Sequence, residues 1–128
     1  GRSNTIATLL PSCSLYLGIP FANARDLINA NIPVALASDF NPGSTPSGNM
    51  NFVVSLGCIK LKMLPEEAIN AATLNGAAAM QLSDVAGSIA IGKKANLFIT
   101  RTMSSIAYLP YSFGQSQIEK IILNGEIN

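Results

Sequence analysis

One carboxylate, Asp39, stands where α/β enzymes keep metal ligands and proton acceptors. It follows the apolar segment Val34–Ser38, which is typical of a buried strand, and it precedes a loop rich in turn-forming residues. At the carboxyl end of a parallel strand, a carboxylate can bind a hard or borderline metal ion, or it can accept a proton from a metal-bound water. The pattern alone also allows an aspartate that caps a helix or braces the loop.

Three residues of the loop after Asp39 could contact a ligand. Asn41 and Ser44 carry polar side chains, and Gly43 allows close approach of the backbone. The same residues are ordinary turn formers, so ligand contact and turn formation both stay open. The chain contains no histidine. These residues alone therefore complete neither a Ser–His or Cys–His pair nor a metal site with imidazole ligands.

The composition narrows the class of protein. Only 12% of the residues are charged and 48% are apolar, whereas a soluble domain carries about 25% charged residues. No apolar run reaches the roughly 20 residues that a membrane-spanning helix needs, so we expect no membrane association. The low charge instead favours a piece of a larger body whose faces are covered by further chain. A net charge of +1 without a cluster of Lys or Arg argues against nucleic-acid binding.

The cysteines and the first residues bear on location. Cys13 and Cys58 are isolated and lack C-x-x-C spacing, which is typical of free thiols in a reducing compartment. Residues 1–4 do not lead into an apolar core followed by a small-residue cleavage site, so the sequence shows no secretory signal. We therefore expect a cytoplasmic protein.

The elements around Asp39 read as a strand–helix–strand unit. Residues 5–10 are a β-branched and apolar run, typical of a strand covered on both faces. Residues 12–21 are expected to form a loop, residues 22–31 a helix with Arg25 and Asp26 on its solvated face, and residues 34–38 the second strand. Such a unit predicts that the two strands are parallel neighbours.

The rest of the chain is predicted to form helices and then small β structure. Helices are expected over 49–62 and 65–80, with a break at Gly76 in the second. A strand is expected at 95–99, and Asn124-Gly125 predicts a two-residue hairpin turn. The aromatic segment 108–113 is either an edge of a ligand site or a loop packed on the body.

Several motifs carry a family resemblance that covers essentially the whole chain. The matching segments are Leu10–Gly18, Ala35–Ser44, Pro65–Ala68 with Ala71–Asn75, Gly87–Ile89 with Gly92–Ala95, and Leu109–Gly114. The stretch that begins at Gly87 is generic to amidohydrolases, whereas the loop after Asp39 and the Leu109–Gly114 segment are more specific. On these residues the chain resembles the imidazolonepropionase family of metal-dependent amidohydrolases.

The resemblance implies an α/β fold and a division of the chain. The fold would be a TIM-like (β/α)8 hydrolase barrel that carries a small composite β-sandwich domain built from both chain ends. Residues 1–85 would be the last strand–helix units of the barrel, and residues 86–128 the C-terminal part of the β domain. The chain would then be a C-terminal fragment. Asn96 stands where amidohydrolases often have aspartate, and we interpret it as a structural variation.

The resemblance also implies a site and a reaction. Asp39 would ligate one zinc or iron ion and would accept a proton from the attacking water. Asn41, Gly43 and Ser44 would line the substrate and product pocket. The enzyme, a homo-oligomer and in particular a dimer, would hydrolyse 4-imidazolone-5-propanoate to N-formimidoyl-L-glutamate in histidine degradation. The histidines of the family site are absent here, so the fragment alone is expected to be inactive and to hold no metal ion.

Two alternatives compete with this interpretation. One is another amidohydrolase, such as a cyclic amide hydrolase or a relative of the nucleobase deaminases, which would share Asp39 and differ in the loop that follows it. The other is a non-catalytic structural or interaction domain, which the lack of histidine favours.

Overall fold

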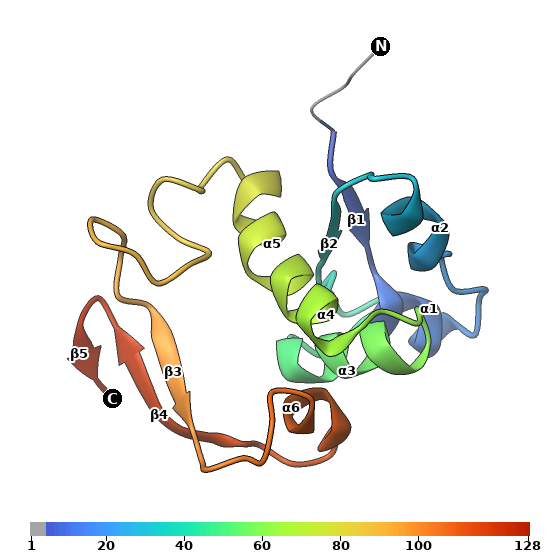
Figure 1. The fold of residues 1–128 in the computed structure, drawn as a ribbon. Helices are drawn as coiled ribbons and strands as arrows, with labels where there is room; N and C mark the ends of the chain where they lie inside the picture. The colour runs from blue at the N-terminus through green and yellow to red at the C-terminus, as the bar shows by residue number, and fades with distance from the viewer. Residues whose placement is uncertain (1–4) are drawn as a thin grey trace.

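The computed structural model describes residues 5–128, so residues 1–4, the start of the expected barrel portion, lie outside the described residues. The fold has an α/β part followed along the chain by a small antiparallel sheet (Figure 1). Two short strands, β1 (Ala7–Leu9) and β2 (Val34–Leu36), open the α/β part. They pair in parallel, with Leu9 opposite Leu36, which confirms the predicted strand–helix–strand unit.

Two helices connect these strands. Helix α2 (Ala24–Asn29) was expected, and its N-cap is Asn23, whose side chain accepts a hydrogen bond from the backbone N–H of Asp26. Helix α1 (Pro11–Leu17) was not expected, because a loop was predicted for residues 12–21. Proline suits the first position of a helix, but most apolar side chains of α1 are exposed. A periodic buried face, the usual sequence signal of a helix, is therefore missing from this segment.

Three helices pack around β2 and form the core with it. They are α3 (Met50–Ile59), α4 (Pro65–Ala72) and α5 (Leu74–Ala79). All three residues of β2 are buried, as expected for a strand covered on both faces. The core consists of small and medium apolar side chains, namely Leu9, Ala24, Val34, Leu36, Val53, Val54, Leu61, Met63, Ala68 and Ala71.

The predicted break at Gly76 is wrong. Gly76 lies inside α5, and the helix is instead interrupted at Thr73, between α4 and α5. The side-chain amide of Asn75 donates a 2.7 Å hydrogen bond to the carbonyl oxygen of Val34. This hydrogen bond ties α5 to the start of β2, a contact that no local pattern around Gly76 can reveal.

The small sheet contains β3 (Leu97–Thr100), β4 (Ile118–Leu123) and β5 (Glu126–Ile127), in that order and all antiparallel. Asn124 and Gly125 both have positive φ between β4 and β5, which confirms the hairpin turn. The backbone N–H of Asn124 donates a 2.7 Å hydrogen bond to the side chain of Asn96. Asn96 therefore has a structural task, since it holds this turn against the start of β3.

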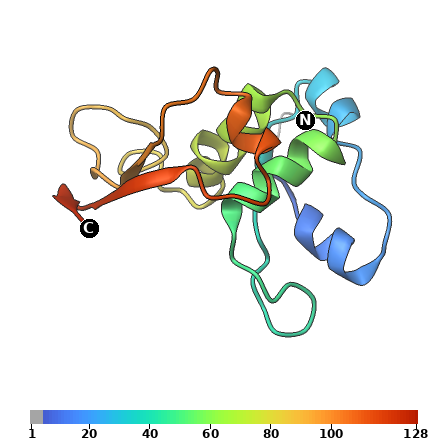
Figure 2. The same ribbon diagram turned by 90° about the horizontal axis from the view of Figure 1, so that it is seen from below.

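A short helix, α6 (Tyr108–Tyr111), occupies the aromatic segment and packs against α3 (Figures 1 and 2). Its buried residue is Pro110, while Tyr111 and Phe113 are exposed. Packing on the body is therefore confirmed for this segment, in which proline is buried and the aromatic rings of Tyr111 and Phe113 are exposed. Within residues 5–128, no helix combines the length and apolar character needed to cross a bilayer.

Candidate functional site

The carboxyl ends of β1 and β2 form the edge that carries Asp39. Because the strands are parallel, the segments that leave them start at the same edge of the sheet. The buried hydroxyl of Ser12, in the first turn of α1, donates a 2.9 Å hydrogen bond to the carbonyl oxygen of Ser38. Figure 2 shows α1 and the loop after β2 projecting on the same side of the molecule. Ser38, the residue before Asp39, is thus held in place by a hydrogen bond from α1.

Asp39 itself is exposed and has a left-handed backbone conformation, with φ of 53°. Across residues 5–128 its carboxylate has no hydrogen-bond or ion-pair partner, and helix α3 is capped by Asn49 instead. The interpretation of Asp39 as a helix cap or a loop brace is therefore wrong. A free carboxylate at this edge suits a cation ligand or a proton acceptor.

The side chain that holds this loop together is that of Asn41. Its side-chain oxygen accepts hydrogen bonds from the backbone N–H groups of Gly43 (2.9 Å) and Ser44 (2.8 Å). Its amide nitrogen donates to the carbonyl oxygen of Asp39 (2.6 Å) and to the hydroxyl of Ser44 (2.9 Å). We name residues 39–45 the Asp39 loop. The structure therefore confirms that Asn41, Gly43 and Ser44 form a turn.

The far end of the Asp39 loop is Thr45, which the sequence analysis did not single out. Two backbone hydrogen bonds between Asn41 and Thr45 close the loop, at 3.0 and 3.3 Å. Thr45 is 2% exposed, and its hydroxyl has no partner among the described residues. No sequence signal could reveal this, because burial of the hydroxyl results from tertiary packing.

The donor set of the described chain fits one ligand of a metal ion rather than a complete site. Asp39 supplies one free carboxylate at the strand edge. No group of three or more His, Cys, Asp or Glu side chains comes together within residues 5–128. A site with three or more such ligands would need side chains from outside the described residues.

Two cavities lie away from Asp39. One, of about 500 Å³, is lined by α5, by the segment that precedes β3 and by the start of β3, including Ala77, Gly87 and Phe98. A second, of about 360 Å³, lies at the amino end of β2 beside Val34 and Asn75. Asp39 lines neither of them, and it is exposed at the strand edge.

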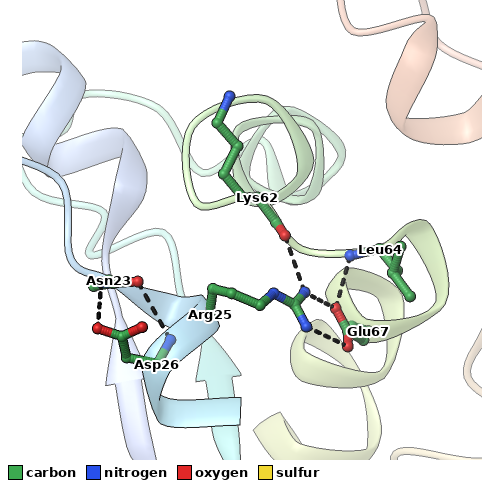
Figure 3. Close-up of polar contacts among 6 residues, drawn as sticks. All are labelled: Asn23, Arg25, Asp26, Lys62, Leu64 and Glu67. Carbon is green, nitrogen blue, oxygen red and sulfur yellow. Dashed lines mark hydrogen bonds and ion pairs between the residues drawn. The ribbon is translucent and has the colours of Figure 1, made fainter. Parts of the chain in front are cut away.

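An ion pair joins α2 and α4 (Figure 3). The guanidinium of Arg25 donates to both carboxylate oxygens of Glu67 and, at 2.9 Å, to the carbonyl oxygen of Lys62. Glu67 also accepts a hydrogen bond from the backbone N–H of Leu64. The guanidinium of Arg25, more than any other group, lowers the pKa of the Glu67 carboxyl below its usual value.

Arg25 was predicted to lie on a solvated face; its side chain is 33% exposed, and its guanidinium also contacts α4. The ion pair with Glu67 joins two helices whose paired residues are 42 positions apart in the sequence. The neighbouring residue Asp26 exchanges hydrogen bonds with Asn23 at the start of α2 (Figure 3). Both contacts organise helices and do not reach the Asp39 loop.

A parallel strand pair packed against helices, with a carboxylate at the carboxyl end of the second strand, defines an α/β protein. Residues 1–127 match the model of the amidohydrolase family. The chain therefore belongs to the amidohydrolase family.

Two curated relatives are imidazolonepropionases. The protein of Flavobacterium johnsoniae is 60% identical over 98% of this chain, and that of Christiangramia forsetii is 58% identical over the same share. The chain spans 30% of the length of each.

One solved structure shows the same fold. It is a zinc-bound adenosine deaminase from Xanthomonas campestris, which is 24% identical with a TM-score of 0.83. The match covers 95% of this chain and 31% of the deaminase. This likeness assigns the chain to the TIM-barrel amidohydrolase fold.

Proposed function

We propose that this chain works as part of a longer imidazolonepropionase, which hydrolyses a carbon–nitrogen bond of 4-imidazolone-5-propanoate and yields N-formimidoyl-L-glutamate in histidine degradation. The observation that carries the proposal is the 60% identity to the Flavobacterium johnsoniae enzyme across nearly the whole chain. The free carboxylate of Asp39 at the carboxyl edge of a parallel strand supports it independently of that similarity.

The proposal includes a division into two parts. Residues 1–85 belong to the last strand–helix units of the barrel, and residues 86–128 are the C-terminal share of a composite β-sandwich. The parallel pair β1–β2 with its helices supports the first assignment, and the antiparallel sheet β3–β4–β5 supports the second.

Asp39 is assigned two tasks. Its carboxylate ligates one zinc or iron ion, and it accepts a proton from the water that attacks the ring amide carbon. When bound, the ion supplies Lewis acidity that polarises the carbonyl and lowers the pKa of water. Because the described chain offers a single free carboxylate at this edge, we expect the isolated chain not to retain the ion.

The Asp39 loop is assigned to the substrate pocket through Asn41, Gly43 and Ser44. The turn formed by these residues starts directly beside the carboxylate, so it lies within reach of a small molecule held there. We further propose a homodimer in the cytoplasm that acts on this small molecule and on neither membranes nor nucleic acid.

The test is turnover of 4-imidazolone-5-propanoate by the full-length enzyme, with zinc and iron content measured on the same samples. We expect Asp39→Asn to lose metal and to lower kcat by at least about a thousandfold, since it removes a ligand and a proton acceptor. Asp84→Asn, a matched change at an exposed carboxylate outside the site, should leave both intact. Normal metal content and rate in Asp39→Asn would remove Asp39 from both tasks.

Substrate choice separates the alternatives. The fold is shared with deaminases, so adenosine, guanine and cytosine belong in the same assay. Turnover of a nucleobase without turnover of the imidazolone would identify a deaminase relative. A full-length protein that binds no metal and turns over none of these compounds would favour the non-catalytic domain.

A further inference from the structure

We propose that Ser12 is a positioning residue, whose hydroxyl fixes the peptide group that precedes Asp39 and thereby the direction in which the Asp39 carboxylate points. Ser12 belongs to α1, which follows β1, and it lies outside the loop assigned to the substrate pocket. The inference rests on the proposed function, in which Asp39 ligates the metal ion and accepts a proton. It adds a residue from the neighbouring strand–helix segment to that task.

The hydroxyl of Ser12 is not used by its own helix. A serine near the start of a helix usually caps it, by accepting a hydrogen bond from a backbone N–H. No described side chain caps α1, which has Leu10 at its N-cap and Pro11 at its first position. The Ser12 hydroxyl instead donates to the carbonyl oxygen of Ser38, at 2.9 Å and 26 positions along the chain. Because Ser12 is 6% exposed, water competes little for this bond.

The bond from Ser12 falls where the sheet stops holding the backbone. At the end of the parallel pair, the N–H of Ala37 donates to the carbonyl oxygen of Leu9, at 3.1 Å. Within the described chain, no backbone-to-backbone hydrogen bond involves residues 38–40. Ser12 therefore supplies the next attachment of the strand end to its neighbour, one residue before the carboxylate.

Holding the carbonyl of Ser38 also holds the amide of Asp39. The two groups belong to one peptide unit, which is planar and does not rotate about its C–N bond. The orientation of Asp39 relative to this plane is then set by its φ, which is 53°. This left-handed value is uncommon for residues other than glycine. Without the bond from Ser12, the peptide unit could turn toward a more common conformation, and the carboxylate would turn with it.

The internal contacts of the Asp39 loop do not fix its orientation on the strand. Asn41 holds the loop together, through the carbonyl oxygen of Asp39 at one end and the backbone of Thr45 at the other. Such bonds preserve the shape of the loop, but they turn with it as one body. The hydrogen bond from Ser12 comes from a different element, so it can hold the start of the loop relative to the sheet.

The experiment measures the zinc affinity of the metal-free full-length enzyme, with zinc alone as the probe, and then kcat and KM of the loaded enzyme. We expect Ser12→Ala to weaken zinc binding about 10- to 100-fold, the usual effect of removing a group that orients a metal ligand. The value of kcat should fall by a similar factor, because the proton acceptor is displaced as well. KM should stay near the wild-type value, because Ser12 is buried and is not assigned to the substrate pocket.

Ser55→Ala is the matched control. Ser55 is also a buried serine, and its hydroxyl donates at 3.0 Å to the carbonyl oxygen of Asn51 within α3. This variant should keep its zinc affinity and kcat. Ser12→Thr keeps the hydroxyl and should restore the zinc affinity that Ser12→Ala loses. If threonine does not fit the buried position and the variant fails to fold, the comparison of the two alanine variants decides the question.

The outcomes separate positioning from general loss of structure. Zinc affinity of Ser12→Ala that equals the wild-type value, or that falls no further than in Ser55→Ala, would overturn the proposal. A fall confined to Ser12→Ala would support it, since both variants lose a buried serine hydroxyl. The zinc measurement needs no substrate. A wild-type enzyme that binds zinc but leaves 4-imidazolone-5-propanoate unchanged would therefore refute the proposed function while leaving the positioning test intact.

Discussion

The hydroxyl of Ser12 donates a hydrogen bond to the carbonyl oxygen of Ser38, across 26 positions of sequence and at a distance of 2.9 Å. The contact joins the first turn of α1 to the residue that precedes Asp39. Two segments that leave neighbouring parallel strands are thereby tied together at the edge where the candidate site lies. The start of the Asp39 loop is consequently fixed from both sides, by Ser12 before it and by Asn41 within it.

Removing this tie should cost stability. Ser12→Ala leaves the carbonyl of Ser38 without its partner, so we expect unfolding free energy to fall by about 1 kcal/mol. Urea denaturation of the full-length enzyme measures it. The matched control is Ser14→Ala in the same helix, because the Ser14 hydroxyl has no hydrogen-bond partner among the described residues. Equal stability of the two variants would contradict a role for the Ser12 contact.

Gly87 should be intolerant of a side chain. Its φ is +87°, and a Cβ there would lie 2.6 Å from the Cβ of Ala77 and 3.0 Å from the carbonyl oxygen of Thr73. Gly92 has nearly the same φ, +88°, but a Cβ there would meet nothing within 4 Å. We therefore expect Gly87→Ala to lower stability by about 1–3 kcal/mol more than Gly92→Ala, because the backbone strain is shared and only the first variant adds a clash. Equal thermal midpoints of the two variants would show that α5 can shift to accept the added methyl group without a loss of stability.

The buried hydroxyl of Thr45 offers a route to stabilisation. Because it has no partner in the described part of the chain, its burial is unfavourable. Thr45→Val keeps the shape of the side chain and removes the hydroxyl, so we expect a gain of about 1 kcal/mol in unfolding free energy. Thr45→Ser, which keeps the hydroxyl and loses the methyl group, should instead destabilise. A loss of stability in Thr45→Val would mean that the hydroxyl has a partner in the full-length enzyme.

The ion pair of Arg25 and Glu67 predicts a dependence of stability on pH. The pKa of Glu67 is lowered on folding from its ordinary value of 4.5, because Arg25 and the Leu64 N–H favour the carboxylate. The unfolded chain therefore binds more protons between the folded and unfolded pKa values. The stabilisation is complete above pH 4.5 and is lost as the pH falls through the lower, folded pKa.

Glu67→Gln should remove this dependence. The free energy of unfolding, measured between pH 3 and pH 7, should be higher for the wild type than for the variant near neutral pH. This difference should shrink as the pH falls. Glu66→Gln changes a carboxylate of the same helix turn that has no ion-pair partner among residues 5–128, so it controls for loss of charge at the start of α4. A gap that stays constant with pH would argue against the pairing.

The local sequence pattern was sufficient to predict most of the helices and strands. The parallel pair, helices α2 and α3, and the hairpin at Asn124-Gly125 follow from apolar runs, caps and residues that accept positive φ. Helix α1 escaped notice because its apolar side chains face outward. The interruption at Thr73 was misplaced at Gly76, and the nearby tie from Asn75 to Val34, which spans 41 positions, has no local signal.

The candidate site was likewise predicted only in part from the sequence. A carboxylate after a buried strand, followed by turn formers, can be recognised within ten residues, and so Asp39 and its loop could be located from the order of amino acids. The sequence could not show which side chains of that loop already have hydrogen-bond partners within the protein. Only in the folded chain are the hydrogen-bonding groups of the Asn41 amide all used and the Thr45 hydroxyl buried, while the Asp39 carboxylate has no partner. Short-range pattern reports the preferences of adjacent residues, whereas hydrogen-bond partners and burial are set by segments that meet through folding alone.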